Sequence, residues 1–87
     1  VGNGCLIMNN AVIETGASIE DHVYIGSGSI ICSGAKVASG AYVGAGSTIL
    51  SDIKVGKNAT IGAGSVVMEN IVSGKTVFGI PAKEIKI

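Results

Sequence analysis

Three stretches of the chain repeat one pattern: VYIGSGSII at 23–31, AYVGAGSTI at 41–49 and ATIGAGSVV at 59–67. The copies begin at Val23, Ala41 and Ala59, a constant interval, and each holds a glycine-flanked triplet without a charged residue. A short, fixed period is the sequence signature of a solenoid, whose repeats bury a core only by stacking on one another. The copies therefore predict stacked coils.

The period divides into six-residue units that are counted from the first residue of the chain. In twelve units, the fifth position is Ala, Ser or Cys nine times, and the fourth is Gly, Asn, Asp or His. Gly, Asn and Asp tolerate the positive φ of a tight turn. Each unit thus predicts a short strand with inward first and fifth side chains, followed by a turn. The first position is always β-branched: Val1, Ile7, Ile13, Ile19, Ile25, Ile31, Val37, Val43, Ile49, Val55, Ile61 and Val67.

Three strand-and-turn sides close one triangular coil, which explains why the triplet returns once in every three units. The pattern resembles the hexapeptide-repeat, left-handed parallel β-helix, an all-β fold, and the hand is taken from this resemblance. About four such coils, with a short C-terminal extension, stack their strands into three sheets. The predicted strands are 5–8, 23–26, 41–44 and 59–62 in the first sheet, 11–14, 29–32, 47–50 and 65–68 in the second, and 17–20, 35–38, 53–56 and 71–74 in the third.

The domain organisation follows from where the pattern holds. We expect the β-helix over residues 1–78 and a C-terminal closing segment over 79–87. Val1 is already in phase, although a solenoid end normally needs a cap over its sheet edges. We therefore expect that an N-terminal part of the protein is absent from this chain.

Composition excludes several classes of function. Six basic and six acidic residues give the 87-residue chain a formal net charge of zero, so it lacks the basic footprint of a nucleic-acid-binding protein. No apolar stretch approaches the roughly 18 residues of a membrane span. Cys5 and Cys32 show no metal-ligand spacing. They indicate reduced thiols in a cytoplasmic protein without a bound metal.

The outer face of the second sheet is apolar, whereas that of the third is mostly polar. An apolar row of this size in water marks an interaction surface. We expect it to pack against other copies of the chain in a closed ring, a homotrimer. The row consists of Val12, Ile30, Leu50, Val66 and Met68.

The glycine triplets stack at the corner between the first and second sheets. They are Gly26-Ser27-Gly28, Gly44-Ala45-Gly46 and Gly62-Ala63-Gly64. One interpretation is a shallow track of accessible main chain that suits an extended, amide-bearing ligand. The other is that a tight turn simply requires small residues. In a ring, this corner meets a neighbour's corner that carries Thr15-Gly16, Ser33-Gly34, Ser51-Asp52 and Glu69-Asn70.

Two longer runs carry a family resemblance. AVIETGASIEDHVYIGSGSIICSGAKVASGAYVGAGSTIL at 11–50 and IGAGSVVMENIVSGKTVFGIPAKEIK at 61–86 resemble sugar O-/N-acyltransferases of the sialic-acid O-acetyltransferase and bacillosamine N-acetyltransferase type. The resemblance implies a CoA-dependent enzyme that acts on an amino or hydroxyl group of a sugar or sugar nucleotide. It also implies acetyl-CoA as co-substrate, lying along the triplets.

The same resemblance assigns the cofactor contacts. It places the cofactor against the main chain of Ala45 and Ala63, with Tyr24 beside the cofactor on the outer face. It places the closing segment, through Gly79, Ile80 and Lys83, at the adenine end. Further lysines that the resemblance brings near the CoA phosphates are Lys75 and Lys86.

The chain departs from this family at the general base. Where the family has a histidine, this chain has Thr15, which cannot take a proton near neutral pH. Three alternatives stay open: an amine acceptor reacts without a protein base, a carboxylate assists, or activity is lost. The candidate carboxylates are Glu14, Asp52 and Glu69.

Other functional hypotheses are weaker. His22, the only histidine, is expected in a turn away from the subunit junction, and one histidine cannot build the zinc site of a carbonic anhydrase on this fold. Cys32 lacks the partner base of a nucleophile. The main alternative to an enzyme is a non-catalytic β-helix module for trimerisation.

Overall fold

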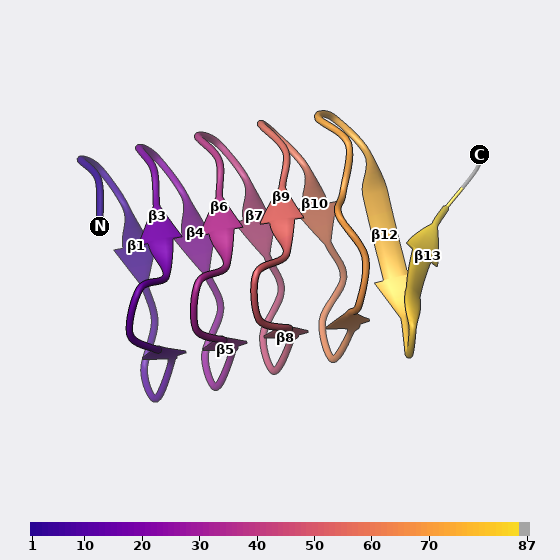
Figure 1. Cartoon of the computed structure of the whole chain (residues 1–87), viewed down its shortest axis with the longest axis horizontal. Helices are drawn as coiled ribbons and strands as arrows, with labels where there is room; N and C mark the ends of the chain where they lie inside the picture. The colour runs from indigo at the N-terminus through magenta and orange to yellow at the C-terminus, as the bar shows by residue number, and fades with distance from the viewer. Residues whose placement is uncertain (86–87) are drawn as a thin grey trace.

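A computed structural model describes residues 1–85 as a β-solenoid of about four triangular coils (Figure 1). Within these residues every regular element is a strand, so no helix capable of crossing a membrane occurs there. Eleven two-residue strands build the coils, and two longer strands follow. The strands are β1 (Leu6–Ile7), β2 (Val12–Ile13), β3 (Ser18–Ile19), β4 (Tyr24–Ile25), β5 (Ile30–Ile31), β6 (Lys36–Val37), β7 (Tyr42–Val43), β8 (Thr48–Ile49), β9 (Lys54–Val55), β10 (Thr60–Ile61), β11 (Val66–Val67), β12 (Thr76–Gly79) and β13 (Ala82–Glu84).

The strands stack into three sheets, as predicted. Sheet A has the order β1-β4-β7-β10-β12-β13, sheet B the order β11-β8-β5-β2, and sheet C the order β3-β6-β9. Strands of successive coils pair in parallel, each residue with its equivalent in the next coil, as Leu6 pairs with Tyr24. The all-β, left-handed parallel β-helix is confirmed. We call the three edges of the prism the A–B, B–C and C–A corners, after the sheets that they join.

The core is a column of β-branched side chains from the first position of each unit. Ile25, Ile31, Ile49 and Ile61 are completely buried, and small fifth-position residues fill the space between them. By contrast, the inward Ile7 is 40% exposed, because the described residues cover the first coil on one side only.

The turns use the positive φ that the fourth position predicts. It is positive at seven glycines and at Asn10, His22, Asp52 and Asn58. His22 has a φ of 57° at the C–A corner, where we expected a turn histidine. Asn70 is the one fourth-position residue without a positive φ in this set, and the reason lies in the last coil.

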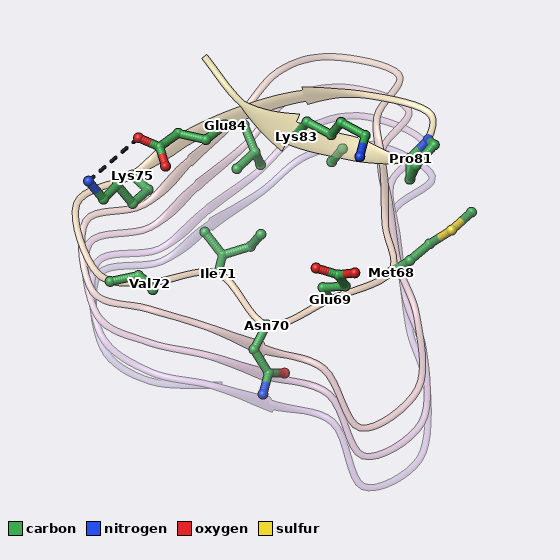
Figure 2. A pocket seen from close by; sticks show the side chains of 11 residues that line it. Met68, Glu69, Asn70, Ile71, Val72, Lys75, Pro81, Lys83 and Glu84 are labelled. Carbon is green, nitrogen blue, oxygen red and sulfur yellow. Dashed lines mark ion pairs between the residues drawn. The ribbon is translucent and has the colours of Figure 1, made fainter. Parts of the chain in front are cut away.

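The last coil is shorter than predicted. Val55 bridges Ile71 and Thr60 pairs with Thr76, so each partner comes two positions earlier in the sequence than the repeat predicts. The Asn70 side-chain oxygen accepts the Lys54 N–H at 2.8 Å, where one coil earlier a main-chain carbonyl accepts the equivalent N–H. In Figure 2 the chain from Met68 to Asn70 cuts inside the corner that earlier coils make. The predicted strand at 71–74 is therefore wrong, since only Ile71 reaches sheet C.

The hairpin of β12 and β13 closes the C-terminal end of sheet A. Its strands are antiparallel, and Val77 is 4% exposed beneath it. The Gly79 N–H donates to Ser65 Oγ at 3.1 Å, which ties the hairpin to the A–B corner. Lys75 and Glu84 form an ion pair at 3.5 Å across its open end (Figure 2).

Two glycines of one triplet provide a test of coil packing. A Cβ on Gly44 would lie 2.5 Å from the Ala63 nitrogen, whereas a Cβ on Gly46 would meet nothing within 4 Å. Gly46→Ala should therefore lose only the roughly 1–2 kcal/mol of an L-residue at positive φ. Gly44→Ala should lose more, because main-chain atoms of the next coil must move. Chemical denaturation of both variants measures the difference, and an equal or smaller loss in Gly44→Ala would contradict this packing.

Candidate functional site

At the A–B corner, the structure explains why both flanking positions of each triplet are glycine. The first lies against the next layer: Gly26 faces the main chain at Ala45, and Gly62 faces the Phe78 ring. The second has a φ of 72° in all three triplets. Packing therefore accounts for the glycines, and the exposed middle residues Ser27, Ala45 and Ala63 are left free to serve a ligand.

The middle residues carry unused hydrogen-bonding groups. Within residues 1–85, the N–H groups of Ser27, Ala45 and Ala63 donate to no protein atom. Equivalent N–H groups at the other corners are often occupied: those of Asn3, Ser33, Ser39 and Lys57 donate to the side chains of Asp21, Glu14, Glu20 and Ser73, respectively. The A–B corner thus presents a row of main-chain donors, one for each coil.

Three buried serines, Ser29, Ser47 and Ser65, support this corner from the interior through hydrogen bonds. The Ser29 and Ser47 hydroxyls donate to the carbonyls of Gly44 and Gly62 at 3.1 Å, and Ser65 accepts from the hairpin. All three serines have zero exposure. The sequence analysis placed them inward without assigning this role. The available signal was that serine takes the fifth position only after the three triplets.

Aromatic side chains flank the triplets on the outer face of sheet A. The rings of Tyr24 and Tyr42 stack with their centroids 4.6 Å apart and their planes 5° apart. Tyr24, a predicted cofactor contact, is half-buried, and Tyr42 is 46% exposed. Phe78 is 55% exposed above Gly62. Tyr42 and Phe78 were not among the predicted contacts.

The predicted contacts in the closing segment lie at the C-terminal end of the same corner. Gly79 follows Phe78 in β12, and Ile80, which is 71% exposed, stands at the hairpin turn. Lys83 in β13 pairs with Phe78 in register. Lys86 lies outside the described residues.

The residues of the predicted acceptor side lie at the B–C corner. Thr15 is exposed in its turn. The Glu14 carboxylate accepts from the Ser33 N–H at 3.0 Å and from its hydroxyl at 3.4 Å. Glu20 makes the same pair of contacts with Ser39 at the C–A corner, so this arrangement belongs to the coil itself.

Asp52 and Glu69 differ from Glu14, because no hydrogen bond or ion pair engages their carboxylates within residues 1–85. Asp52 sits in a turn at a φ of 63°, and its carboxylate lies over Gly34. Glu69 lies in the shortened last coil, inside the outline of this corner, and lines the C-terminal cavity (Figure 2). Of the two, only Asp52 therefore stands at the corner itself with an available carboxylate.

The two groups of predicted site residues do not converge within one chain. The triplets lie at one edge of sheet B, and Thr15, Asp52 and Glu69 lie at the other. The exposed row on sheet B occupies the face between them. A site that combines both groups therefore needs two chains.

The cysteine thiols are free. Burial and, to a smaller degree, the negative charge of Glu14 raise the pKa of Cys32, which opposes its use as a nucleophile. No cluster of three His, Cys, Asp or Glu side chains that could bind a metal occurs within residues 1–85.

Two hollows lie away from the triplets. A cavity of about 500 Å³ opens at the C-terminal end between the shortened coil and β13, with Ile71, Val77 and Lys83 in its wall (Figure 2). A groove of about 560 Å³ runs over the outer face of sheet C and includes Lys36 and Lys54. Neither was predicted from the sequence.

Comparison with known proteins identifies related chains. The family profile described as bacterial transferase hexapeptide (six repeats) matches residues 1–33 and 34–69. A hexapeptide transferase family protein from Anaplasma phagocytophilum is 30% identical with a TM-score of 0.91, over 100% of this chain and 54% of that chain. No curated protein sequence matches the chain.

Two further solved structures are complexes with CoA. A variant of perosamine N-acetyltransferase from Caulobacter crescentus, with CoA and GDP-perosamine, is 24% identical with a TM-score of 0.98, over 100% of this chain and 41% of that chain. A serine acetyltransferase with CoA is 33% identical with a TM-score of 0.72, over 94% of this chain and 39% of that chain. This chain thus spans about half or less of the length of these relatives.

The effect of Glu14 on Cys32 is testable. Glu14→Gln keeps an oxygen for Ser33 but removes the charge, so the pKa of Cys32 should fall. The pH dependence of Cys32 alkylation, followed by peptide mass spectrometry, should then shift to lower pH. Glu20→Gln is the matched control, because Glu20 makes the same contacts with Ser39. An equal shift in both variants would show that the local charge is not the cause.

Proposed function

Because the chain belongs to the bacterial transferase hexapeptide family, we propose that it is the β-helix part of a CoA-dependent acyltransferase. The enzyme transfers an acetyl group from acetyl-CoA to an amino or hydroxyl group of a sugar or sugar nucleotide. The observation that carries this proposal is the row of unpaired N–H groups at Ser27, Ala45 and Ala63. Two related structures that hold CoA support it.

The triplets suit the pantetheine arm of CoA, which is extended and contains two amides. Its carbonyls accept from the free N–H groups of Ala45 and Ala63. Its own N–H groups donate to the carbonyls of Gly46 and Gly64, which accept nothing else within residues 1–85. Successive coils repeat these groups at about 4.8 Å, the spacing of neighbouring strands. The main chain thereby holds the cofactor much as an added strand would be held.

The remaining cofactor contacts follow from their positions along the corner. Tyr24 lies beside the thioester half of the arm. Gly79 and Ile80 border the adenine, and Lys83 faces the phosphates together with Lys75. Tyr24, Gly79 and Lys83 lie in strands of sheet A. The proposed division of the chain is a β-helix over 1–78 and a closing segment over 79–87.

An amine acceptor best fits a site without the family histidine. The neutral amine attacks the thioester carbonyl, a carbon–nitrogen bond forms and the carbon–sulfur bond breaks. The proton lost by nitrogen goes to the leaving thiolate. Thr15 cannot act as a base, and Glu14 is held by Ser33. If a carboxylate assists, Asp52 is the better placed, because Glu69 lines the C-terminal cavity instead.

The site forms between subunits of a homotrimer. On sheet B, Val12, Ile30, Leu50 and Met68 are between 37% and 47% exposed, and Val66 completes the row. A closed ring built on this face buries it. The A–B corner of one chain then faces the B–C corner of the next, which brings the row of triplets opposite the corner that carries the neighbour's Thr15 and Asp52. The free thiols are consistent with a cytoplasmic location.

A second function is favoured by two features of the B–C corner. Thr15 stands at the family base position, and the carboxylate of the preceding residue, Glu14, is engaged with Ser33. A module that binds CoA or trimerises without catalysing transfer would tolerate both features. Release of free CoA thiol from acetyl-CoA in the presence of amino-sugar nucleotides separates the two functions.

Blocking one turn tests the triplet site. Ala45→Tyr places a bulky side chain over the middle N–H row, so CoA affinity should fall by at least about tenfold, the equivalent of one lost charge-assisted or two neutral hydrogen bonds. Isothermal titration with acetyl-CoA measures the change. Ser39→Tyr is the matched control, because it occupies the same turn position at the C–A corner. Equal loss in both variants, or no CoA binding by the unaltered protein, would remove the proposal.

A charge on sheet B tests the trimer. Ile30→Asp places a carboxylate at the centre of the apolar row, where burial without a partner is costly. Sedimentation equilibrium should show three chains for the unaltered protein and one for the variant. Ser18→Asp, on sheet C, should leave the assembly intact. A monomeric mass for the unaltered protein would rule out the ring.

A further inference from the structure

The groove on sheet C is a second place where this chain can hold a ligand. We propose that it binds the diphosphate group of a nucleotide-linked acceptor. The inference deepens the proposed function and rests on it for the link to the reaction, but the binding itself stands on the groove.

The groove contains two lysines in register. Lys36 in β6 and Lys54 in β9 are paired residues of adjacent parallel strands, and both are exposed. Their side chains leave the same face of sheet C about 4.8 Å apart at the strands. Lys57, at the adjoining C–A corner, lines the same groove. Like charges placed directly opposite in a sheet repel each other, so this arrangement costs stability unless an anion lies between them.

No carboxylate of the described chain neutralises these lysines. The only ion pair within residues 1–85 is that of Lys75 and Glu84. Along the lysine row, the flanking residues are the neutral Ser18 and Asn70. Glu20 is the one acidic residue of the groove, and its carboxylate is turned to the N–H and hydroxyl of Ser39.

The floor beside the lysines is open. The adjacent outward row has Ala38 and Gly56 where the lysine row has long side chains, and the groove measures about 560 Å³. Its C-terminal end is shaped by the shortened coil, since Asn70 and Ser73 line it. The hollow therefore offers ammonium groups along one wall, with room for a compact polyanion between that wall and the C–A corner.

A diphosphate fits this chemistry better than a single carboxylate would. Its two to three negative charges match the three lysines, and its several oxygens accept hydrogen bonds from more than one ammonium group. Lysine binds phosphate as a point charge and needs no fixed fork geometry. Such a ligand also relieves the repulsion between Lys36 and Lys54.

In the proposed ring, this groove borders the reaction site. When sheet B faces the threefold axis, the outer faces of sheet A in one chain and sheet C in the next form the two walls of the cleft between them. Lys36 and Lys54 then face the neighbour's Tyr42 and its triplets. A diphosphate held on sheet C therefore keeps the rest of its molecule within the same cleft.

The experiment compares three forms of the protein by isothermal titration with inorganic pyrophosphate. The double variant Lys36→Gln/Lys54→Gln keeps the side-chain length and removes both charges. It should lose at least about tenfold in affinity. Lys36→Arg/Lys54→Arg keeps the charges and should bind as the unaltered protein does. Thermal unfolding of all three confirms that they are folded. Equal binding by the glutamine variant, or no binding by the unaltered protein, would overturn the inference.

Titration with UDP and with CoA tests the source of the diphosphate. UDP affinity should fall in the glutamine variant while CoA affinity stays unchanged, and an equal loss of CoA affinity would overturn the assignment to the acceptor. The Ala45→Tyr variant keeps the two proposals apart, because it should retain pyrophosphate binding. A protein that binds pyrophosphate but not CoA would retain the groove and lose the proposed function.

Discussion

The close approach of successive coils is the constraint on which this molecule depends. A solenoid of two-residue strands has no long ladders, so each coil is held by its neighbours at about strand spacing. At Gly26 and Gly44 the main chain of the next coil leaves no room for a Cβ, and eleven of the twelve turns place their fourth-position residue at positive φ. β-branched residues then fill the narrow interior, as Ile25 and Ile49 do without any exposure.

The same constraint explains why the A–B corner suits the proposed cofactor site. At the A–B corner, close packing between coils accounts for the glycines, and the hydroxyls of buried serines donate to the carbonyls of Gly44 and Gly62. What remains is the outward main chain of Ala45 and Ala63, with small side chains that cover nothing. In the proposed site, affinity for CoA therefore depends on the main chain, and selectivity depends on the side chains around it. The aromatic pair on sheet A and the lysines on sheet C are the most distinctive of those surroundings.

The sequence predicted the fold because a period of six fixes both the side chains that point inward and the turns. It could not reveal the shortened last coil, because Ile71 is β-branched and inward in either register, so the pattern looks unbroken there. It placed Glu14 among the candidate bases, whereas its bonds to Ser33 depend on how one coil lies over the next. It stacked Lys36 and Lys54 on the third predicted sheet, as the structure does, but it did not show the groove beside them, because the groove depends on the shortened last coil.

The side chain of Asn70 has a consequence for the ends of the solenoid. The Asn70 side-chain oxygen accepts the Lys54 N–H, where a main-chain carbonyl accepts the equivalent N–H in the earlier coils. Because a side-chain amide is not part of a strand, no further strand of sheet C can pair at this position. Sheet A ends in an antiparallel strand that carries Lys83 and Glu84, and charged residues of this kind discourage edge pairing. Two of the three sheets are thus protected against end-to-end stacking of molecules, so a repeat that could in principle extend without limit is given a defined length at this end.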